Sequence, residues 1–104
     1  MDELRVVLCT CPPDAAERLA HGLVEQRLAA CVNVLPRIRS IYRWQGAVSN
    51  DEESLLIVKT RAAAFDALRE WLLQAHPYEV PEIIALPVTE GAPDYLAWVT
   101  EQTR

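Results

Sequence analysis

The apolar residues of this chain follow two spacings that predict different elements. Short runs rich in β-branched residues, such as LRVVLCT and ESLLIVKT, are typical of strands. Apolar residues three and four positions apart, as at Leu19 and Leu23 or at Leu68 and Leu72, are typical of helices. The pattern predicts strands over residues 4–10, 30–45, 53–60 and 82–88, with helices after the first and third strands and a short helix at the end.

Local signals predict where these elements begin and end. Asp14, followed by Glu17 three residues later, predicts a capping box at the first helix, and Thr60 is expected to cap the second. Residues 46–51 predict a turn that joins two strands into a long hairpin. Because Pro36 cannot donate a hydrogen bond to a neighbouring strand, we expect a sheet edge or a bulge at that position.

The order of these elements predicts the fold class. Strand, helix, strand, strand, helix, strand is the order of the split βαβ arrangement. We therefore expect an α+β protein, a ferredoxin-like βαββαβ sandwich with a long hairpin between the second and third strands and an extra C-terminal helix. The chain has 104 residues and contains no internal repeat or linker, so we expect a single domain over residues 1–104.

The strands also predict an assembly. Residues 6–9, 55–58 and 83–86 are apolar at both parities, which is typical of strands buried on both faces. Two main helices cover only one face of such a sheet, and the last helix is too short to cover the other alone. We therefore expect another subunit to cover the second face, so that the protein forms a homo-oligomer.

Composition narrows the classes of function. Half of the residues are apolar (51%), which is typical of a globular protein, and the net charge of −5 argues against nucleic-acid binding. The start of the chain lacks the basic and long apolar regions of a secretory signal, and no apolar stretch is long enough to span a bilayer. We therefore expect a cytoplasmic protein whose three cysteines are reduced thiols.

Two of these cysteines, Cys9 and Cys11, occur in the stretch LCTCPPD. Residues i and i+2 of a strand point the same way, so both thiols share one face if the strand extends to Cys11. A thiolate pair suits copper(I) or zinc, but two thiolates are an incomplete set for zinc. The alternative is that Cys9 is a core residue, because free cysteine is among the most buried residue types. We interpret Cys31, within a run of small apolar residues, as core.

Other residues suggest a ligand cleft or, alternatively, structural contacts. Lys59 ends an apolar strand and needs a partner, for which Glu82 is the candidate. Tyrosine and tryptophan rings with a few polar groups can line a pocket, but they also fill interfaces. The candidate cleft residues are Tyr42, Trp44, Lys59, Glu82, Tyr95 and Trp98. Arginines at 37, 39 and 43 are expected to pair with acids at 51–53 or to receive an anion.

Six motifs in order give the chain a family resemblance. They are VVLCT, LAACVNVLP, SIYRWQG, LIVKT, HPYEVPEIIALPV and DYLAWV, and they extend over nearly the whole chain. In this set the chain resembles the CutA divalent-cation tolerance family. The resemblance implies a trimer similar to the PII signalling proteins, with ligand clefts between subunits, and a link to divalent metals that includes copper binding. It also implies a metal role for Cys9.

The same resemblance brings His76 into the candidate metal site. Some family members carry two adjacent histidines here, whereas this chain has Ala75 and His76. Without the resemblance, the place of His76 at a helix end is a strong explanation, because the ring can bond the last carbonyls and, when charged, interact favourably with the helix dipole. The alternative is a metal ligand through a neutral imidazole nitrogen. The other histidine, His21, is expected on the surface of a helix.

Three functional hypotheses follow. The first is a homotrimeric tolerance protein that binds copper or another divalent cation through Cys9 and His76, not as a requirement for folding. The second is a PII-like small-ligand sensor that uses the cleft residues. The third is acid–base catalysis by Lys59, Glu82 and Tyr95. The chain has neither a nucleophile–base pair at a recognisable spacing nor a glycine-rich phosphate loop, so we expect no enzymatic activity.

Overall fold

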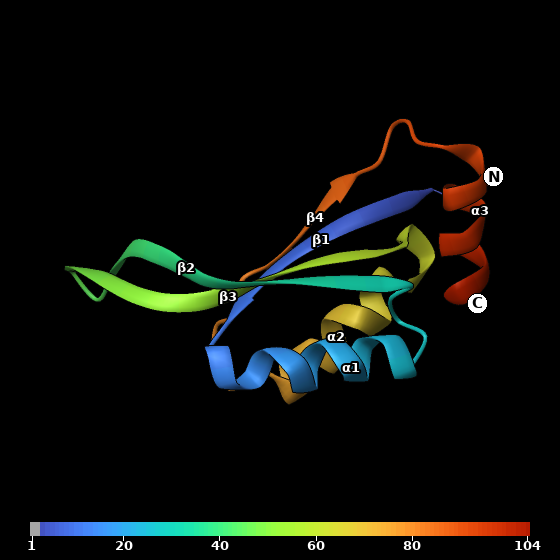
Figure 1. Ribbon diagram of the computed structural model, residues 1–104. Coiled ribbons are helices and arrows are strands. Elements are labelled where there is room, and N and C mark those ends of the chain that lie inside the picture. The colour runs from blue at the N-terminus through green and yellow to red at the C-terminus, as the bar shows by residue number, and fades with distance from the viewer. Residues whose placement is uncertain (1–2) are drawn as a thin grey trace.

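The computed structural model describes residues 3–104 of the chain (Figure 1). Its regular elements follow one another in the predicted order. They are β1 (Leu4–Cys11), α1 (Ala16–Glu25), β2 (Cys31–Trp44), β3 (Ala47–Arg61), α2 (Phe65–Ala75), β4 (Ile83–Pro87) and α3 (Pro93–Gln102), with short 3-10 helices at Pro13–Ala15 and Ala62–Ala64. The expected domain range of 1–104 includes residues 1–2, which lie outside the described part.

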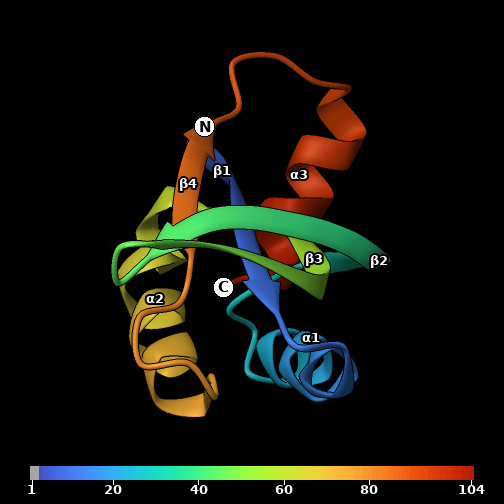
Figure 2. The same cartoon turned by 90° about the vertical axis from the view of Figure 1, so that its left-hand side faces the viewer.

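The four strands form one antiparallel sheet in the order β2-β3-β1-β4. Both α1 and α2 lie on one side of it, and α3 lies apart from them at one end (Figures 1 and 2). The α+β class and the long hairpin are therefore confirmed. Strand β1, from the start of the chain, lies between β3 and β4 and pairs with both.

The core lies between the sheet and the helix pair. Alternate residues of β1 point into it, and Val7, Cys9 and Cys11 are all fully buried. They meet Leu56 and Val58 of β3, and the helices add four leucines from the predicted stripes: Leu19, Leu23, Leu68 and Leu72. β1 extends to Cys11, so both thiols share one face as expected. Both behave as small apolar core residues.

The hairpin of β2 and β3 extends beyond the rest of the sheet. We call residues 38–53 the arm, because here β2 and β3 pair with each other while β1 ends opposite Ser54. The arm makes the molecule long, with extents of 45 × 25 × 22 Å (Figure 1). Its turn is tighter than the predicted 46–51, because β3 already begins at Ala47. Gln45 (φ 49°) and Gly46 (φ 81°) make a two-residue turn with positive φ at both positions.

Pro36, which has no backbone N–H to donate, lies on an edge strand next to a bulge. β2 is an edge strand, and its pairing with β3 is interrupted by an irregularity between Leu35 and Ile38. At this bulge Arg37 has a left-handed backbone with φ 62°. The edge and the bulge expected from the missing amide donor are both present. The bulge marks the base of the arm.

Both predicted helix caps are wrong. Asp14 lies inside the 3-10 helix that precedes α1, and no side chain caps α1. Thr60 belongs to β3, and its hydroxyl donates a hydrogen bond to the carbonyl of Leu28 at 2.6 Å. The extended pattern of β3 continues through Thr60, so α2 begins only at Phe65. In both places a 3-10 turn, rather than a side-chain cap, leads into the helix.

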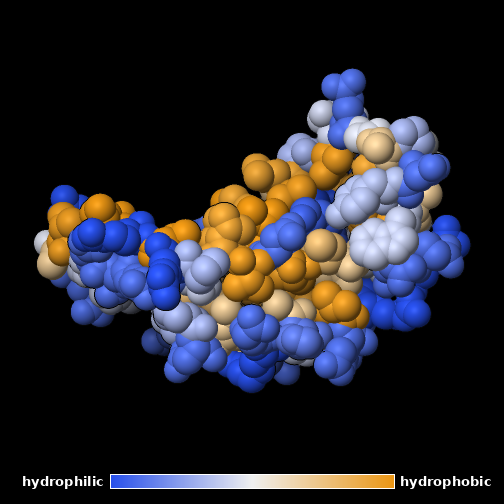
Figure 3. Space-filling view, viewed as in Figure 1, coloured by the Kyte–Doolittle hydropathy of each residue, from blue (hydrophilic) through white to orange (hydrophobic). Residues whose placement is uncertain are grey.

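The other face of the sheet is apolar and partly open. Leu35, Ile84 and Leu86 project from it with 39%, 51% and 47% of their surface exposed. We call this surface the open face; the registers place Val6, Leu8, Leu55 and Ile57 on it as well. Figure 3 shows apolar surface along the sheet above the helix layer. α3 covers only the end of the sheet, where Val99 packs with Leu4 and Ala30.

Candidate functional site

The two predicted metal ligands meet at one backbone carbonyl. Cys9 comes from β1, and His76 follows the last residue of α2. The carbonyl of Thr10 accepts the Cys9 thiol at 3.7 Å and the Nε2–H of His76 at 2.8 Å. Both side chains are buried, with Cys9 at 0% and His76 at 6% exposure. A soft sulfur and an imidazole nitrogen from distant parts of the sequence therefore lie close together in one subunit.

Both ring nitrogens of His76 are occupied. Nε2 faces the carbonyl of Thr10, so it carries a proton, while Nδ1 accepts the backbone N–H of Tyr78 at 3.0 Å. This pattern defines a neutral imidazole that links the end of α2 to β1 and to the segment before β4. No nitrogen lone pair is available to an ion while these bonds persist. The proposed interaction of a charged His76 with the helix dipole is not what holds it here.

The thiol of Cys9 is protonated at neutral pH. Burial raises its pKa from 9.0 to about 12, and the nearby charges of Cys11, Glu82 and Glu53 act in the same direction. Burial also raises the pKa of Cys11, to about 11. Metal ligation requires the thiolate, so an ion must displace the thiol proton. Within residues 3–104 no group of three His, Cys, Asp or Glu side chains is arranged to hold a metal ion.

The burial and protonation of the three cysteines predict which thiol an alkylating reagent modifies first. Cys31 is half-buried on the open face, 4.0 Å from the ammonium of Lys59, which corrects its assignment to the core. Iodoacetamide at pH 7.5 should therefore label Cys31 in the folded subunit before Cys9 and Cys11, which become reactive only in denaturant, and a neighbouring subunit on the open face would slow the labelling of Cys31. Mass spectrometry of peptides counts the modified sites. Rapid native labelling of Cys9 would contradict the buried, protonated state.

A cavity lies between the arm and the segment 77–80. We call it the arm cavity; its volume is about 720 Å³. One wall is the arm, with Ser40, Ile41, Tyr42 and Trp44, and the other is the segment 77–80. Thr10, Glu53 and Glu82 also line it. The cavity therefore holds three of the six predicted cleft residues: Tyr42, Trp44 and Glu82.

Two tyrosine–carboxylate pairs border this cavity. Tyr78 donates to Glu53 Oε2 at 2.8 Å, and Tyr42 donates to Asp51 within the arm. Burial and the bond to Glu53 raise the pKa of Tyr78, and the bond to Asp51 raises that of Tyr42. Both phenols therefore remain protonated donors. Sequence reasoning assigned no role to Tyr78. In β3, Glu53 falls on the same face as Leu55 and Ile57, and an acid on this apolar face is the signal that a partner such as Tyr78 was needed.

Lys59 does not pair with Glu82. Lys59 lies opposite Val6 of β1, and its ammonium contacts Asn33 and Cys31 of β2. Glu82 precedes β4, whose ladder begins with Ile83 opposite Cys9, so it lies toward the other end of the sheet. The predicted ion pair is wrong because the register separates the two residues.

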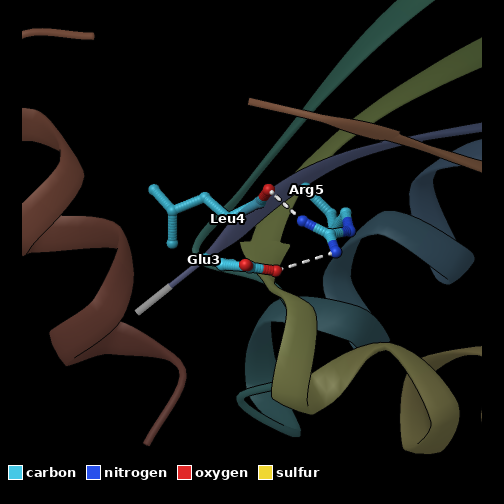
Figure 4. A network of polar contacts seen from close by, with 3 residues as sticks. All are labelled: Glu3, Leu4 and Arg5. Carbon is cyan, nitrogen blue, oxygen red and sulfur yellow. Dashed lines mark hydrogen bonds and ion pairs between the residues drawn. The ribbon is translucent and has the colours of Figure 1, made fainter. Parts of the chain in front are cut away.

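Lys59 and Tyr95 line a second, smaller cavity of about 210 Å³ between the sheet and α3. Its other basic residue, Arg5, donates at 3.1 Å to the Leu4 carbonyl and to a Glu3 carboxylate oxygen (Figure 4). Tyr95 stacks on Trp98, with 5.7 Å between the ring centroids, and burial raises the pKa of Tyr95. The predicted cleft residues are therefore divided between two places, and Lys59, Glu82 and Tyr95 do not form one acid–base group.

The other charged candidates lie on the surface. Arg39 faces Glu52 across the arm, yet no ion pair joins the arginines at 37, 39 and 43 to the acids at 51–53 within residues 3–104. Asp51 and Glu53 instead accept the hydroxyls of Tyr42 and Tyr78. His21 is exposed on α1, 3.8 Å from Glu17, as expected. None of the described helices is long and apolar enough to span a membrane.

Comparison with known proteins gives consistent results. Residues 5–102 match the family described as CutA1 divalent ion tolerance protein. The divalent-cation tolerance protein CutA of Thermus thermophilus is 54% identical over 99 residues, covering 94% of this chain and 96% of that protein. A solved structure of the divalent cation tolerance protein from Thermus thermophilus, with 53% identity, superposes with a TM-score of 0.94 over 97% of this chain and 99% of the other. The chloroplastic protein CutA of Arabidopsis thaliana is 47% identical over 95% of this chain, which spans 55% of that protein.

Proposed function

The chain belongs to the CutA1 divalent ion tolerance protein family, and from this premise we propose that it acts in divalent-cation tolerance by binding such an ion, with copper as the first candidate. The single observation that carries the site is the meeting of Cys9 and His76 at the Thr10 carbonyl. In this role the ion is cargo, and the fold has its core without it. The Thermus thermophilus relative is named for tolerance, and we infer a non-enzymatic role.

We further propose that the working form is a homotrimer of ferredoxin-like subunits. The partly exposed leucines and isoleucine of the open face support an assembly, since large contiguous apolar patches are uncommon on monomeric proteins. The number three comes from the family resemblance alone. Light scattering at micromolar concentration tests this proposal, and a monomer mass would contradict it.

Ion binding at this pair requires local opening. The subunit does not fit a resident ion as it stands, because the Cys9 thiol is protonated and both His76 nitrogens are bonded. We propose that the ion replaces the thiol proton on Cys9 and takes His76 from Thr10 or from the Tyr78 amide. Cys11 lies one strand position further on the same face and is available as a third donor. Soft sulfur and imidazole donors suit copper.

Copper titration across pH tests this site. At pH 5.5–7.5, far below the Cys9 pKa of about 12, the thiol is protonated, so each pH unit should raise the apparent affinity about tenfold through the displacement of one proton. In Cys9→Ser this dependence should disappear and the affinity should fall. Calorimetry gives both quantities. Cys31→Ser is the matched control, and it should retain the wild-type affinity and pH dependence.

Each outcome has a defined meaning. If Cys9→Ser and His76→Gln bind copper as wild type does, the ion binds elsewhere and the proposed site is wrong. Glutamine is chosen because it keeps a donor for the Thr10 carbonyl. If Cys11→Ser also lowered the affinity for copper, the Cys11 thiol would be a third ligand. Five candidate residues of the alternative, a PII-like sensor, line two separate cavities of the subunit, and Trp98 lines neither.

A further inference from the structure

The backbone amide of Tyr78 depends on one nitrogen of His76. This amide donates to Nδ1 of the ring at 3.0 Å, while Nε2–H of the same ring donates to the Thr10 carbonyl at 2.8 Å. A neutral imidazole has one proton and one lone pair, and both are in use here. An ion that binds the ring must therefore change its hydrogen bonds.

The Tyr78 amide loses its acceptor whichever nitrogen of His76 binds the ion. An ion on Nδ1 occupies the lone pair that the amide uses. An ion on Nε2 leaves the ring proton on Nδ1, and a protonated Nδ1 then faces the amide as donor to donor. The loss of this bond therefore follows from the chemistry of the ring, independently of the side from which the ion arrives. An amide without a partner is costly unless it reaches water.

Tyr78 makes both hydrogen bonds that hold residues 77–80 to the rest of the chain within residues 3–104. Besides the amide bond, its hydroxyl donates to Glu53 Oε2 at 2.8 Å. We call residues 77–80 the strap, because they form no helix or strand and cross from the end of α2 toward β4. The Tyr78 ring also packs 4.8 Å from the His76 ring. Loss of the amide bond leaves the strap with the bond to Glu53 alone.

Glu53 connects the strap to the arm. It is the last residue of the arm, where it lies opposite Ile38, and it is only 5% exposed. A carboxylate buried to this extent is costly without a hydrogen-bond partner, and Tyr78 provides that partner. A movement of the strap that shifts Tyr78 therefore changes the surroundings of Glu53, at the point where the arm leaves the sheet.

We propose that ion binding by His76 releases the strap from the end of α2, and that the released strap loosens the base of the arm through Tyr78 and Glu53. This inference rests on the proposed function, because it needs an ion at His76. Coupling between two equilibria is reciprocal. Since ion binding breaks contacts of the strap, those contacts lower the affinity for the ion.

Hydrogen exchange of the copper-loaded protein tests the release. A ligand that only fills a site stabilises the native state and slows exchange. With copper at the concentration that saturates the calorimetric titration, the amides of Tyr78, Glu79 and Val80 should instead exchange about tenfold faster than without copper, as expected for the loss of one hydrogen bond. Exchange at residues 38–39 and 52–53 should also become faster. Mass spectrometry of peptides measures both regions.

Two variants of the same chemistry test the connection to the arm. Tyr78→Phe removes the hydroxyl bond to Glu53 but keeps the amide and the ring. Ion binding then has one bond fewer to disturb, so this variant should bind copper about tenfold more tightly than wild type. Tyr42→Phe removes the hydroxyl bond to Asp51 within the arm and should keep the wild-type affinity. Equal affinity in the two variants would contradict the coupling through Glu53.

The results distinguish this inference from the proposed ion site. If copper binding depends on Cys9 and His76 but the strap exchanges no faster with copper, the ion site stands and the release of the strap is wrong. If wild type binds no copper, or if His76→Gln binds it as wild type does, both proposals are overturned, because no ion then binds His76.

Discussion

Replacing His76 by alanine should lower the free energy of unfolding by about 2–4 kcal/mol, because two buried partners lose their hydrogen bonds. The Thr10 carbonyl loses the ring donor at 2.8 Å, and the Tyr78 amide loses the ring acceptor at 3.0 Å. The ring also packs 4.8 Å from that of Tyr78. Urea unfolding followed by circular dichroism measures the change from the shift in the transition midpoint.

A matched control separates this role from that of any histidine. His21 is exposed on α1 and makes only a 3.8 Å contact with Glu17, so His21→Ala should change stability by less than about 0.5 kcal/mol. If the two alanine variants were equally stable, the bonds of His76 would not hold β1, α2 and the segment 77–80 together. A large loss in His76→Ala also means that metal titrations must use a variant of proven stability, such as glutamine.

Replacing Leu86 by aspartate should convert the proposed trimer into monomers. Leu86 lies on β4 with 47% of its surface exposed, opposite Val6 on the open face. An assembly that covers this face would have to bury the new carboxylate without a partner, which costs several kcal/mol per subunit. Light scattering and sedimentation velocity should report the trimer mass for wild type and the monomer mass for Leu86→Asp.

Leu73 provides the control for this prediction. It is 51% exposed but lies on α2, away from the open face. Leu73→Asp introduces the same charge and should leave the mass unchanged. If Leu86→Asp kept the wild-type mass, or if Leu73→Asp dissociated the protein equally, the open face would not be the surface that joins the subunits.

The order of elements could be predicted because each is encoded by local spacing. Leu19 and Leu23, one helical turn apart, point from α1 into the core of the protein. The β-branched runs form the central strands. The residues at which the helices begin could not be predicted from candidate cap residues. Thr60 has a good capping side chain, but the ladder with β1 holds it in the strand and its hydroxyl bonds Leu28. Tertiary pairing overrode the local preference at that position.

The candidate metal ligands remain a prediction. Cys9 and His76 both bond the Thr10 carbonyl, but these bonding states were not visible in the sequence, and a role in binding an ion is not tested by them. Lys59 and Glu82 looked like partners because each stands beside an apolar run. The register between β1, β3 and β4 places them toward opposite ends of the sheet. Glu53 was named only as one possible partner for arginine, and its burial depends on the segment 77–80.

The arm has a consequence for how ligand binding depends on protein concentration. A two-stranded ribbon is marginally stable in water by itself, and residues 38–53 pair only within such a ribbon. One wall of the arm cavity is built on it, so the cavity keeps its shape only while the ribbon is ordered. If neighbouring subunits order the ribbon, dilution that separates them also disorders this wall and lowers the affinity of the cavity for any molecule bound there. Affinity and assembly are then linked by mass action, and each should be measured with the other fixed.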